Sequence, residues 1–148
     1  MNYAKLMAAS VSATLVMTVF MLLAPYIYLP KMNVGHLLGA MFGQSDAIGW
    51  VLHFVLGIVF GYVYVAVLND KLPVENHTAR GTIYGIIVFV FSEVILTLIN
   101  FMGYLNWTER ESMAKMVFGN ALACLIYGAV LGSFYKSKDT GLSAFKPV

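Results

Sequence analysis

Charged residues and cysteine are scarce in this sequence. Only 11% of its 148 residues are charged, against about 25% in an ordinary soluble domain. No run of Lys or Arg is long enough to form a nucleic-acid-binding or polybasic lipid-binding surface. The single cysteine, Cys124, excludes an internal disulfide and a cysteine-rich metal site. Because it lies in an apolar stretch, we expect it to be a small packing residue.

Apolar residues are abundant instead. They make up 60% of the sequence, and the mean hydropathy is +0.80. A soluble domain of this size cannot bury that much apolar surface. The composition therefore excludes a soluble enzyme, a disordered chain and a nucleic-acid-binding module. It predicts an integral membrane protein with one domain over residues 1–148.

Four apolar runs are long enough to cross a bilayer as helices, since a hydrocarbon core of roughly 30 Å needs about 20 apolar residues. A helix satisfies its backbone polar groups within the span, and these runs are too continuous for barrel strands. The first run is longer than a signal-peptide core, so we expect an uncleaved helix. The predicted fold is an all-α, four-helix membrane bundle with spans at about 3–28, 47–68, 80–103 and 109–135.

A shorter helix is predicted between the first two spans, at 33–43. Pro25 and Pro30 end or kink the first span, and Asn33 can cap the new helix. Its apolar residues recur at helical spacing and form one stripe, namely Val34, Leu37, Leu38, Met41 and Phe42. Such a helix lies in the membrane interface or packs across the bundle. The segment from Thr108 to Glu111 matches a capping box for the fourth span.

The distribution of basic residues predicts the orientation. An even number of spans places both termini on one side, which holds Lys5, Lys71, Arg80, Lys136, Lys138 and Lys146; the other side holds Lys31, Arg110 and Lys115. This excess favours cytoplasmic termini. Aromatic residues near the span ends are expected to anchor the helices at the interfaces, among them Tyr64, Tyr84 and Tyr135.

Glu93 lies deep in the third span, about 13 residues or roughly 20 Å from its cytoplasmic end. A lipid-exposed carboxylate is costly there, so Glu93 must face a cavity or protein. The same depth arithmetic places Thr18, His53 and Asn120 in the outer half of the other three helices. Facing inward, the four residues would form a polar cluster with His53 and Glu93 as a candidate ion pair. Two interpretations stay open, namely a proton relay or ligand contact and a hydrogen-bonded structural core.

Metal and haem ligands are few. Zinc takes three or four ligands, and His77 is expected across the membrane from His36 and His53. A haem held by His53 would need a second axial ligand. The sequence has no phosphate-binding loop, nucleophile–base pair or Asp-rich motif. We therefore expect no metal, cofactor or enzymatic activity, and the sequence identifies no small-molecule substrate.

Two further patterns concern helix packing. The second and fourth spans each carry an aromatic–Gly pair, with a polar residue seven positions before the aromatic residue. This weak repeat suggests two helical hairpins related by a pseudo-twofold axis along the membrane normal. Glycines also recur four apart, at Gly57 and Gly61, Gly81 and Gly85, and Gly128 and Gly132. They form either packing contacts within the bundle or a docking face for another protein.

Two motifs carry a family resemblance. The segment from His53 to Tyr64 reads His-Phe-x-x-Gly-x-x-Phe-Gly-x-x-Tyr, and the segment from Tyr127 to Tyr135 reads Tyr-Gly-x-x-x-Gly-x-x-Tyr. Together with the segment 13–18 and Pro25, they resemble a family of small bacterial four-helix membrane proteins of unknown function. The resemblance covers nearly the whole chain and implies a location in the bacterial inner membrane, but no established activity.

This chain departs from that family at one position. The family's fourth helix usually begins its motif with Gly-His, whereas this chain has Gly119 and Asn120. The departure disfavours any metal or haem site that is made from two histidines.

The main functional hypothesis is a non-catalytic accessory subunit of a larger membrane assembly, such as an electron-transport complex. It rests on the small mass outside the membrane, the small-residue faces and the short interfacial helix. The expected partners are membrane lipid and other integral membrane subunits, not nucleic acid. The alternative is a small oligomeric transporter or proton-conducting protein that uses the polar cluster around Glu93.

Overall fold

The structure is a computed structural model that describes residues 2–68, 71, 74–101, 103 and 110–135. Its helices are α1 (Tyr3–Leu23), α2 (Val34–Met41), α3 (Asp46–Val63), α4 (His77–Phe101) and α5 (Arg110–Phe134). The 3-10 turn η1 (Ala24–Ile27) extends α1, and the π-helical turn η2 (Tyr64–Leu68) extends α3. These described residues contain no strand. The predicted all-α fold is confirmed.

Four helices are long and apolar enough to cross a membrane, namely Tyr3–Ile27, Asp46–Leu68, His77–Phe101 and Met113–Phe134. They correspond to the four predicted spans. The short helix α2 lies within the predicted range 33–43, and its position at the membrane interface stays a prediction. The capping box at Thr108 lies outside the described residues.

Side-chain caps set several helix starts. The Asn2 side chain accepts a hydrogen bond from the Lys5 backbone N–H at 3.2 Å, at the start of α1. The Asn33 side chain accepts one from the His36 N–H at 3.0 Å, at the predicted start of α2. Since the first backbone N–H groups of a helix lack partners within the helix, these asparagines stabilise the ends.

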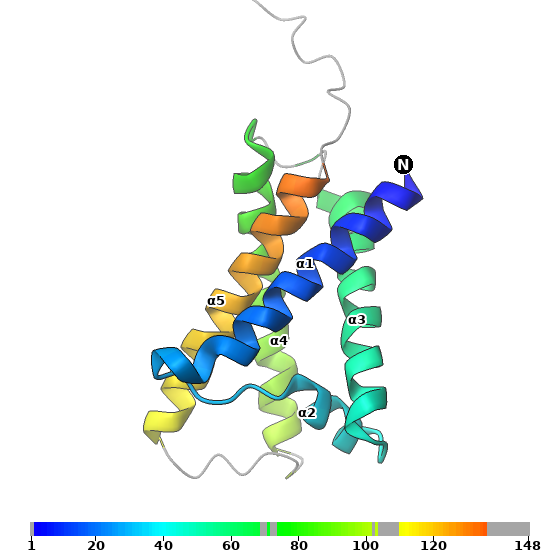
Figure 1. Cartoon of the computed structure of the whole chain (residues 1–148). Coiled ribbons are helices and arrows are strands. Elements are labelled where there is room, and N and C mark those ends of the chain that lie inside the picture. The colour runs from blue at the N-terminus through cyan, green and yellow to red at the C-terminus, as the bar shows by residue number, and fades with distance from the viewer. Residues whose placement is uncertain (1, 69–70, 72–73, 102, 104–109, 136–148) are drawn as a thin grey trace, which may run out of the picture.

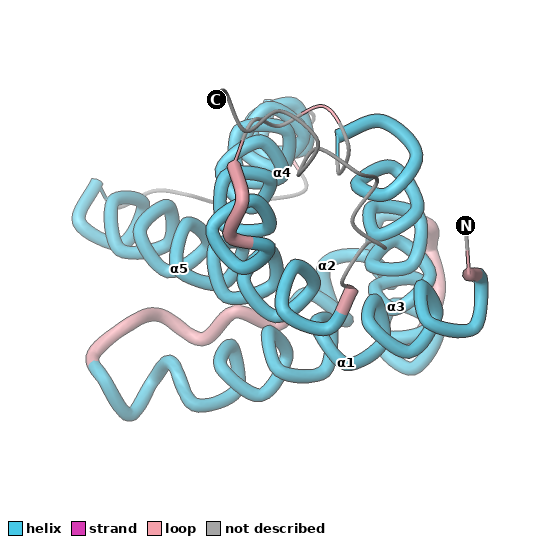
Figure 2. The backbone as a smooth tube through the Cα atoms, turned by 90° about the horizontal axis from the view of Figure 1, so that it is seen from above, coloured by secondary structure: helices cyan, strands magenta, loops and turns pink. Residues whose placement is uncertain are grey.

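The long helices form two antiparallel pairs (Figure 1). Helix α4 packs along α5, and α1 crosses the bundle obliquely and contacts both α3 and α5. Viewed from above, α3, α1, α5 and α4 follow one another around the bundle (Figure 2). Helix α2 packs against α3 at the end away from the N-terminus. The described chain therefore contains two hairpins, while the pseudo-twofold axis between them stays a prediction.

The six paired glycines are all buried against other helices of this chain. A Cβ built on Gly57 or Gly61 would meet the side chains of Thr14 and Ser10 on α1. A Cβ built on Gly85 would lie 2.5 Å from the carbonyl oxygen of Cys124 on α5. Their close contacts within the bundle favour the packing interpretation of these glycines over the docking face.

Three tyrosines form the centre of the core, since Tyr64, Tyr84 and Tyr127 are almost fully buried. The Tyr84 hydroxyl donates to the Phe60 carbonyl at 2.7 Å, and the Tyr127 hydroxyl donates to the Gly57 carbonyl at 2.6 Å. Both hydrogen bonds tie the α4–α5 pair to α3. The prediction that Tyr64, Tyr84 and Tyr135 are interfacial anchors is therefore wrong, because all three lie inside the bundle.

Candidate functional site

Glu93 belongs to a polar network between α4 and α5. The Asn120 side-chain amide nitrogen donates to Glu93 Oε1 at 2.7 Å and to Ser92 Oγ at 2.9 Å. Ser92 Oγ in turn donates to the Phe89 carbonyl at 2.8 Å. The Cys124 thiol donates a hydrogen bond to Asn120 Oδ1, with a distance of 3.7 Å between sulfur and oxygen. The two protons on the Asn120 nitrogen are thus shared between Glu93 and Ser92, which fixes the orientation of this amide.

A second, separate pair joins α1 to α3. Thr18 Oγ1 donates to the Thr14 carbonyl at 2.7 Å and lies 3.2 Å from His53 Nε2. Because the hydroxyl proton is used on Thr14, His53 Nε2–H is the donor in the second contact. The edges and faces of Trp50 and Phe54 surround the His53 ring, with centroids 5.8 and 5.9 Å away. The imidazole is buried among these side chains.

The four polar residues named from the sequence therefore form two pairs. Glu93 lies with Asn120, and His53 lies with Thr18. Within the described part of the chain, His53 and Glu93 make no ion pair. The separation follows from the helix pairing, because α3 is held against α1 whereas α4 is held against α5.

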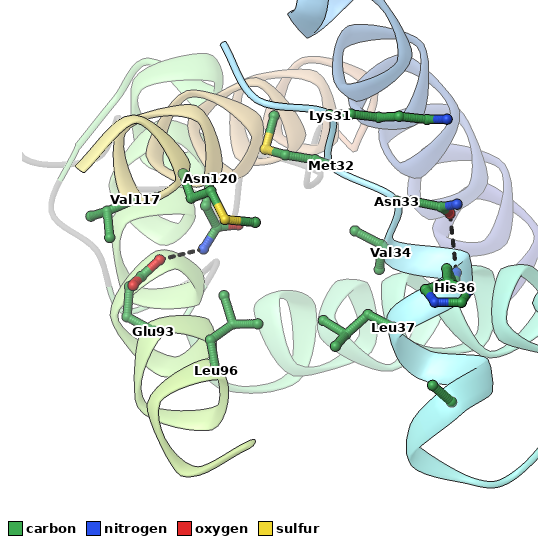
Figure 3. A pocket seen from close by; sticks show the side chains of 12 residues that line it. Lys31, Met32, Asn33, Val34, His36, Leu37, Glu93, Leu96, Val117 and Asn120 are labelled. Carbon is green, nitrogen blue, oxygen red and sulfur yellow. Dashed lines mark hydrogen bonds between the residues drawn. The ribbon is translucent and has the colours of Figure 1, made fainter. Parts of the chain in front are cut away.

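A cavity of about 250 Å³ adjoins the Glu93 network. The segment before α2, and the helices α2, α4 and α5, all contribute to the wall of this cavity (Figure 3). Its lining residues are Lys31, Met32 and Asn33 before α2; Val34, His36, Leu37 and Ala40 of α2; Glu93 and Leu96 of α4; and Met116, Val117 and Asn120 of α5. Most of these side chains are apolar, and the ionisable ones are Lys31, His36 and Glu93.

The position of α2 at this cavity depends on close packing with α3. A Cβ on Gly49 of α3 would lie 2.6 Å from the Gly39 backbone nitrogen, so no larger residue fits between the two helices. His36 Nδ1 and Asp46 Oδ1, which are 2.9 Å apart, also link α2 to the start of α3. This contact is solvent-exposed and contributes little stability. The glycine contact therefore holds α2 in place.

Sequence reasoning missed Ser92, the segment 31–33 and the cavity itself. The apolar stripe of the predicted short helix was the available signal, since Val34 and Leu37 of that stripe line the cavity. Ser92 was also visible as a polar neighbour of Glu93 in an apolar run.

The described residues contain no group of three or more His, Cys, Asp or Glu side chains that could hold a metal ion. Cys124 is buried and is not part of a disulfide. The Glu93 carboxylate and the Asn120 amide form a polar part of the wall of a mostly apolar cavity. Such a wall can bind a hydrogen-bond donor or a cation.

With four apolar helices long enough to cross a bilayer, the chain is a multi-pass membrane protein. It belongs to the DUF6789 family, a family of unknown function, whose sequence model matches residues 2–141. The resemblance to a family of unknown function is thereby confirmed. No curated protein and no solved structure matches the chain.

Proposed function

We propose that this protein is a non-catalytic accessory subunit of a larger membrane assembly, such as an electron-transport complex. The supporting observation is a shallow, open apolar hollow on the surface of α4, lined by Ile86, Ile87, Val90, Phe91 and Val94. Beside it, α3 meets α4 through the rings of Phe60 and Phe91, whose centroids are 5.8 Å apart. The residues that line the hollow all belong to α4, and their side chains are exposed.

A transmembrane helix from another subunit suits this surface. Helices associate in membranes mainly through close packing, because lipid tails are as apolar as the side chains. A hollow that the side chains of a partner helix can fill is therefore a better site for association than a flat apolar face. Among the described residues, the polar side chains of Ser10, Thr14, Thr18 and His53 are buried, whereas large apolar side chains of α4, such as Val90 and Val94, are exposed.

We further propose that the protein lies in the bacterial inner membrane with both termini in the cytoplasm. The start of α1 and the end of α5 lie at the same end of the bundle (Figure 1). Six of the nine basic residues are predicted from the sequence to lie on the same side of the membrane as the two termini. A cysteine introduced in place of Asn2 should resist membrane-impermeant thiol reagents in intact cells and react after the cells are broken. Labelling in intact cells would reverse the orientation.

Site-specific photo-crosslinking in native membranes tests the subunit role. A crosslinker at Val90 in the hollow should give one discrete adduct with another membrane protein. Leu22 on α1 is the matched control, since both side chains are 56% exposed, and it should give only diffuse lipid adducts. Equal patterns at the two positions would count against a partner at α4.

The second candidate function is transport or proton conduction through an oligomer, and the cavity beside Glu93 favours it. Reconstituted into liposomes, the wild-type protein should then carry a measurable ion or proton flux. Glu93→Gln should abolish the flux and leave the fold intact, because glutamine can still accept from Asn120. The absence of flux in the wild-type protein would remove this candidate.

A further inference from the structure

The Glu93 carboxylate has unused capacity to bind a ligand. Its Oε1 accepts from Asn120 at 2.7 Å. No other hydrogen bond or ion pair to this carboxylate is present among the residues that the structure describes. A carboxylate carries four lone-pair sites on two oxygens, so the second oxygen is available to a donor from the cavity.

The other ionisable groups at the cavity do not neutralise Glu93. Lys31 points away from Glu93, and its ammonium lies on the far side of the cavity (Figure 3). The His36 side chain is held by Asp46 at 2.9 Å. An ionised carboxylate at membrane depth is costly without a counter-ion. A cationic ligand would supply the missing charge.

The size and walls of the cavity define the rest of the ligand. Val34 and Leu37 of α2, Leu96 of α4 and Val117 of α5 give it apolar walls. An apolar cavity of about 150 Å³ can hold a benzene molecule. The cavity of about 250 Å³ therefore has room for one aromatic ring or short alkyl chain together with an aminomethyl group.

We propose that this cavity binds a small amphiphilic primary amine, with its ammonium on Glu93 and its apolar part between α2 and α5. The ammonium donates to the free carboxylate oxygen, and the apolar part leaves water or lipid for the walls of the cavity. This binding is a property of the chain itself and does not depend on a partner subunit. Failure of this inference would leave the accessory-subunit role untouched.

Equilibrium dialysis with radiolabelled benzylamine tests the site on the full chain in phosphatidylcholine nanodiscs. The wild-type protein should bind benzylamine saturably at pH 7, and Glu93→Gln should bind it at least tenfold more weakly. Glu75→Gln removes the same charge from an exposed position outside the cavity and should bind like the wild type. Unlabelled benzyl alcohol, which has nearly the same shape without the charge, should compete poorly.

A second variant keeps the test decisive if Glu93→Gln disturbs folding. Leu37→Trp fills the cavity from α2 without altering the carboxylate, and it should also abolish saturable binding. The proposal is overturned if the wild-type protein shows no saturable binding, or if Glu93→Gln and Leu37→Trp bind benzylamine as the wild type does.

Two natural sources of such an amine can be separated in the same assay. A lipid with an ethanolamine headgroup carries a primary ammonium, whereas choline has no N–H to donate. If the amine is a lipid headgroup, benzylamine should bind more weakly in phosphatidylethanolamine nanodiscs than in phosphatidylcholine. Equal binding in the two lipids would assign the site to a free amine.

Discussion

Replacing Gly128 by alanine should push α4 and α5 apart. A Cβ at this position would lie 2.7 Å from the Gly85 backbone nitrogen and 2.8 Å from Gly85 Cα. It would also contact the Gly81 carbonyl oxygen. Carbon atoms pack at about 3.5–4.0 Å, so relieving the 2.8 Å contact with Gly85 Cα alone needs a shift of about 0.7 Å, and the closer Gly81 oxygen needs at least as much. Backbone atoms form this contact, and no side chain can rotate to relieve it.

Gly119→Ala is the matched control in the same helix. A Cβ at Gly119 meets Met32 Cε at 3.0 Å and Sδ at 3.1 Å. This thioether is the far end of a flexible side chain and can shift at low cost. Both variants gain the same helix propensity from alanine, about 1 kcal/mol at most. The difference between them therefore isolates the cost of forcing the two backbones apart.

Overpacking a close contact costs about 1–3 kcal/mol. Gly128→Ala should be less stable than Gly119→Ala by that amount, which is roughly a 5-fold to 140-fold change in the unfolding equilibrium at 1.4 kcal/mol per factor of ten. Unfolding by SDS in mixed micelles, followed by tryptophan fluorescence, measures the difference. Equal unfolding midpoints for the two variants would show that the close backbone contact between α4 and α5 does not limit the stability of the bundle.

Two further pairs of substitutions test polar contacts within the bundle. Tyr127→Phe removes the donor to the Gly57 carbonyl and should lower the free energy of unfolding by about 0.5–1.5 kcal/mol, while Tyr62→Phe at an exposed position should change it little; similar losses in the SDS titration would argue against the buried hydrogen bond. Glu93→Gln should keep the melting temperature in detergent because it retains an acceptor for Asn120, whereas Glu93→Leu should lower it at a cost of about 1–3 kcal/mol. Identical melting temperatures for these two variants would show that the Asn120 contact adds no stability.

The membrane spans could be predicted from the sequence because long apolar runs have few alternatives in a bilayer. Their ends were less certain, since short polar contacts decide them. Helix α4 begins at His77, three residues before the predicted Arg80. The Asn76 side chain accepts from the Thr78 N–H at 2.9 Å and stabilises this earlier start. A helix cap of this kind involves only a few residues, whereas the predicted boundary of a span depends on the hydropathy of a much longer segment.

The sequence predicts how deep each residue of the candidate site lies in the membrane, but not which neighbouring helix its side chain faces. The rise of a helix gives the depth of a residue along the membrane normal, and it correctly drew attention to Glu93 and Asn120, which are in contact. It does not determine which neighbour a helix faces. His53 is therefore paired with Thr18 rather than Glu93, because α3 packs on α1.

Side-chain contacts between helices that are distant in the sequence could not be predicted either. Tyr84 is close to the predicted membrane interface, where tyrosine is common. In the structure its hydroxyl reaches the Phe60 carbonyl of α3, and the ring packs on Tyr64 with centroids 5.1 Å apart. Such contacts depend on how the two hairpins meet, which no local pattern specifies.

Purification of the tagged chain from its native membranes in a mild detergent tests the proposed accessory role most directly. We expect stoichiometric recovery of a defined set of larger membrane subunits, identified by mass. Val90→Trp, which fills the hollow on α4, should abolish this recovery, and Leu22→Trp at the equally exposed position on α1 should preserve it. Elution of the wild-type chain alone, or a complex that Val90→Trp leaves unchanged, would contradict the account.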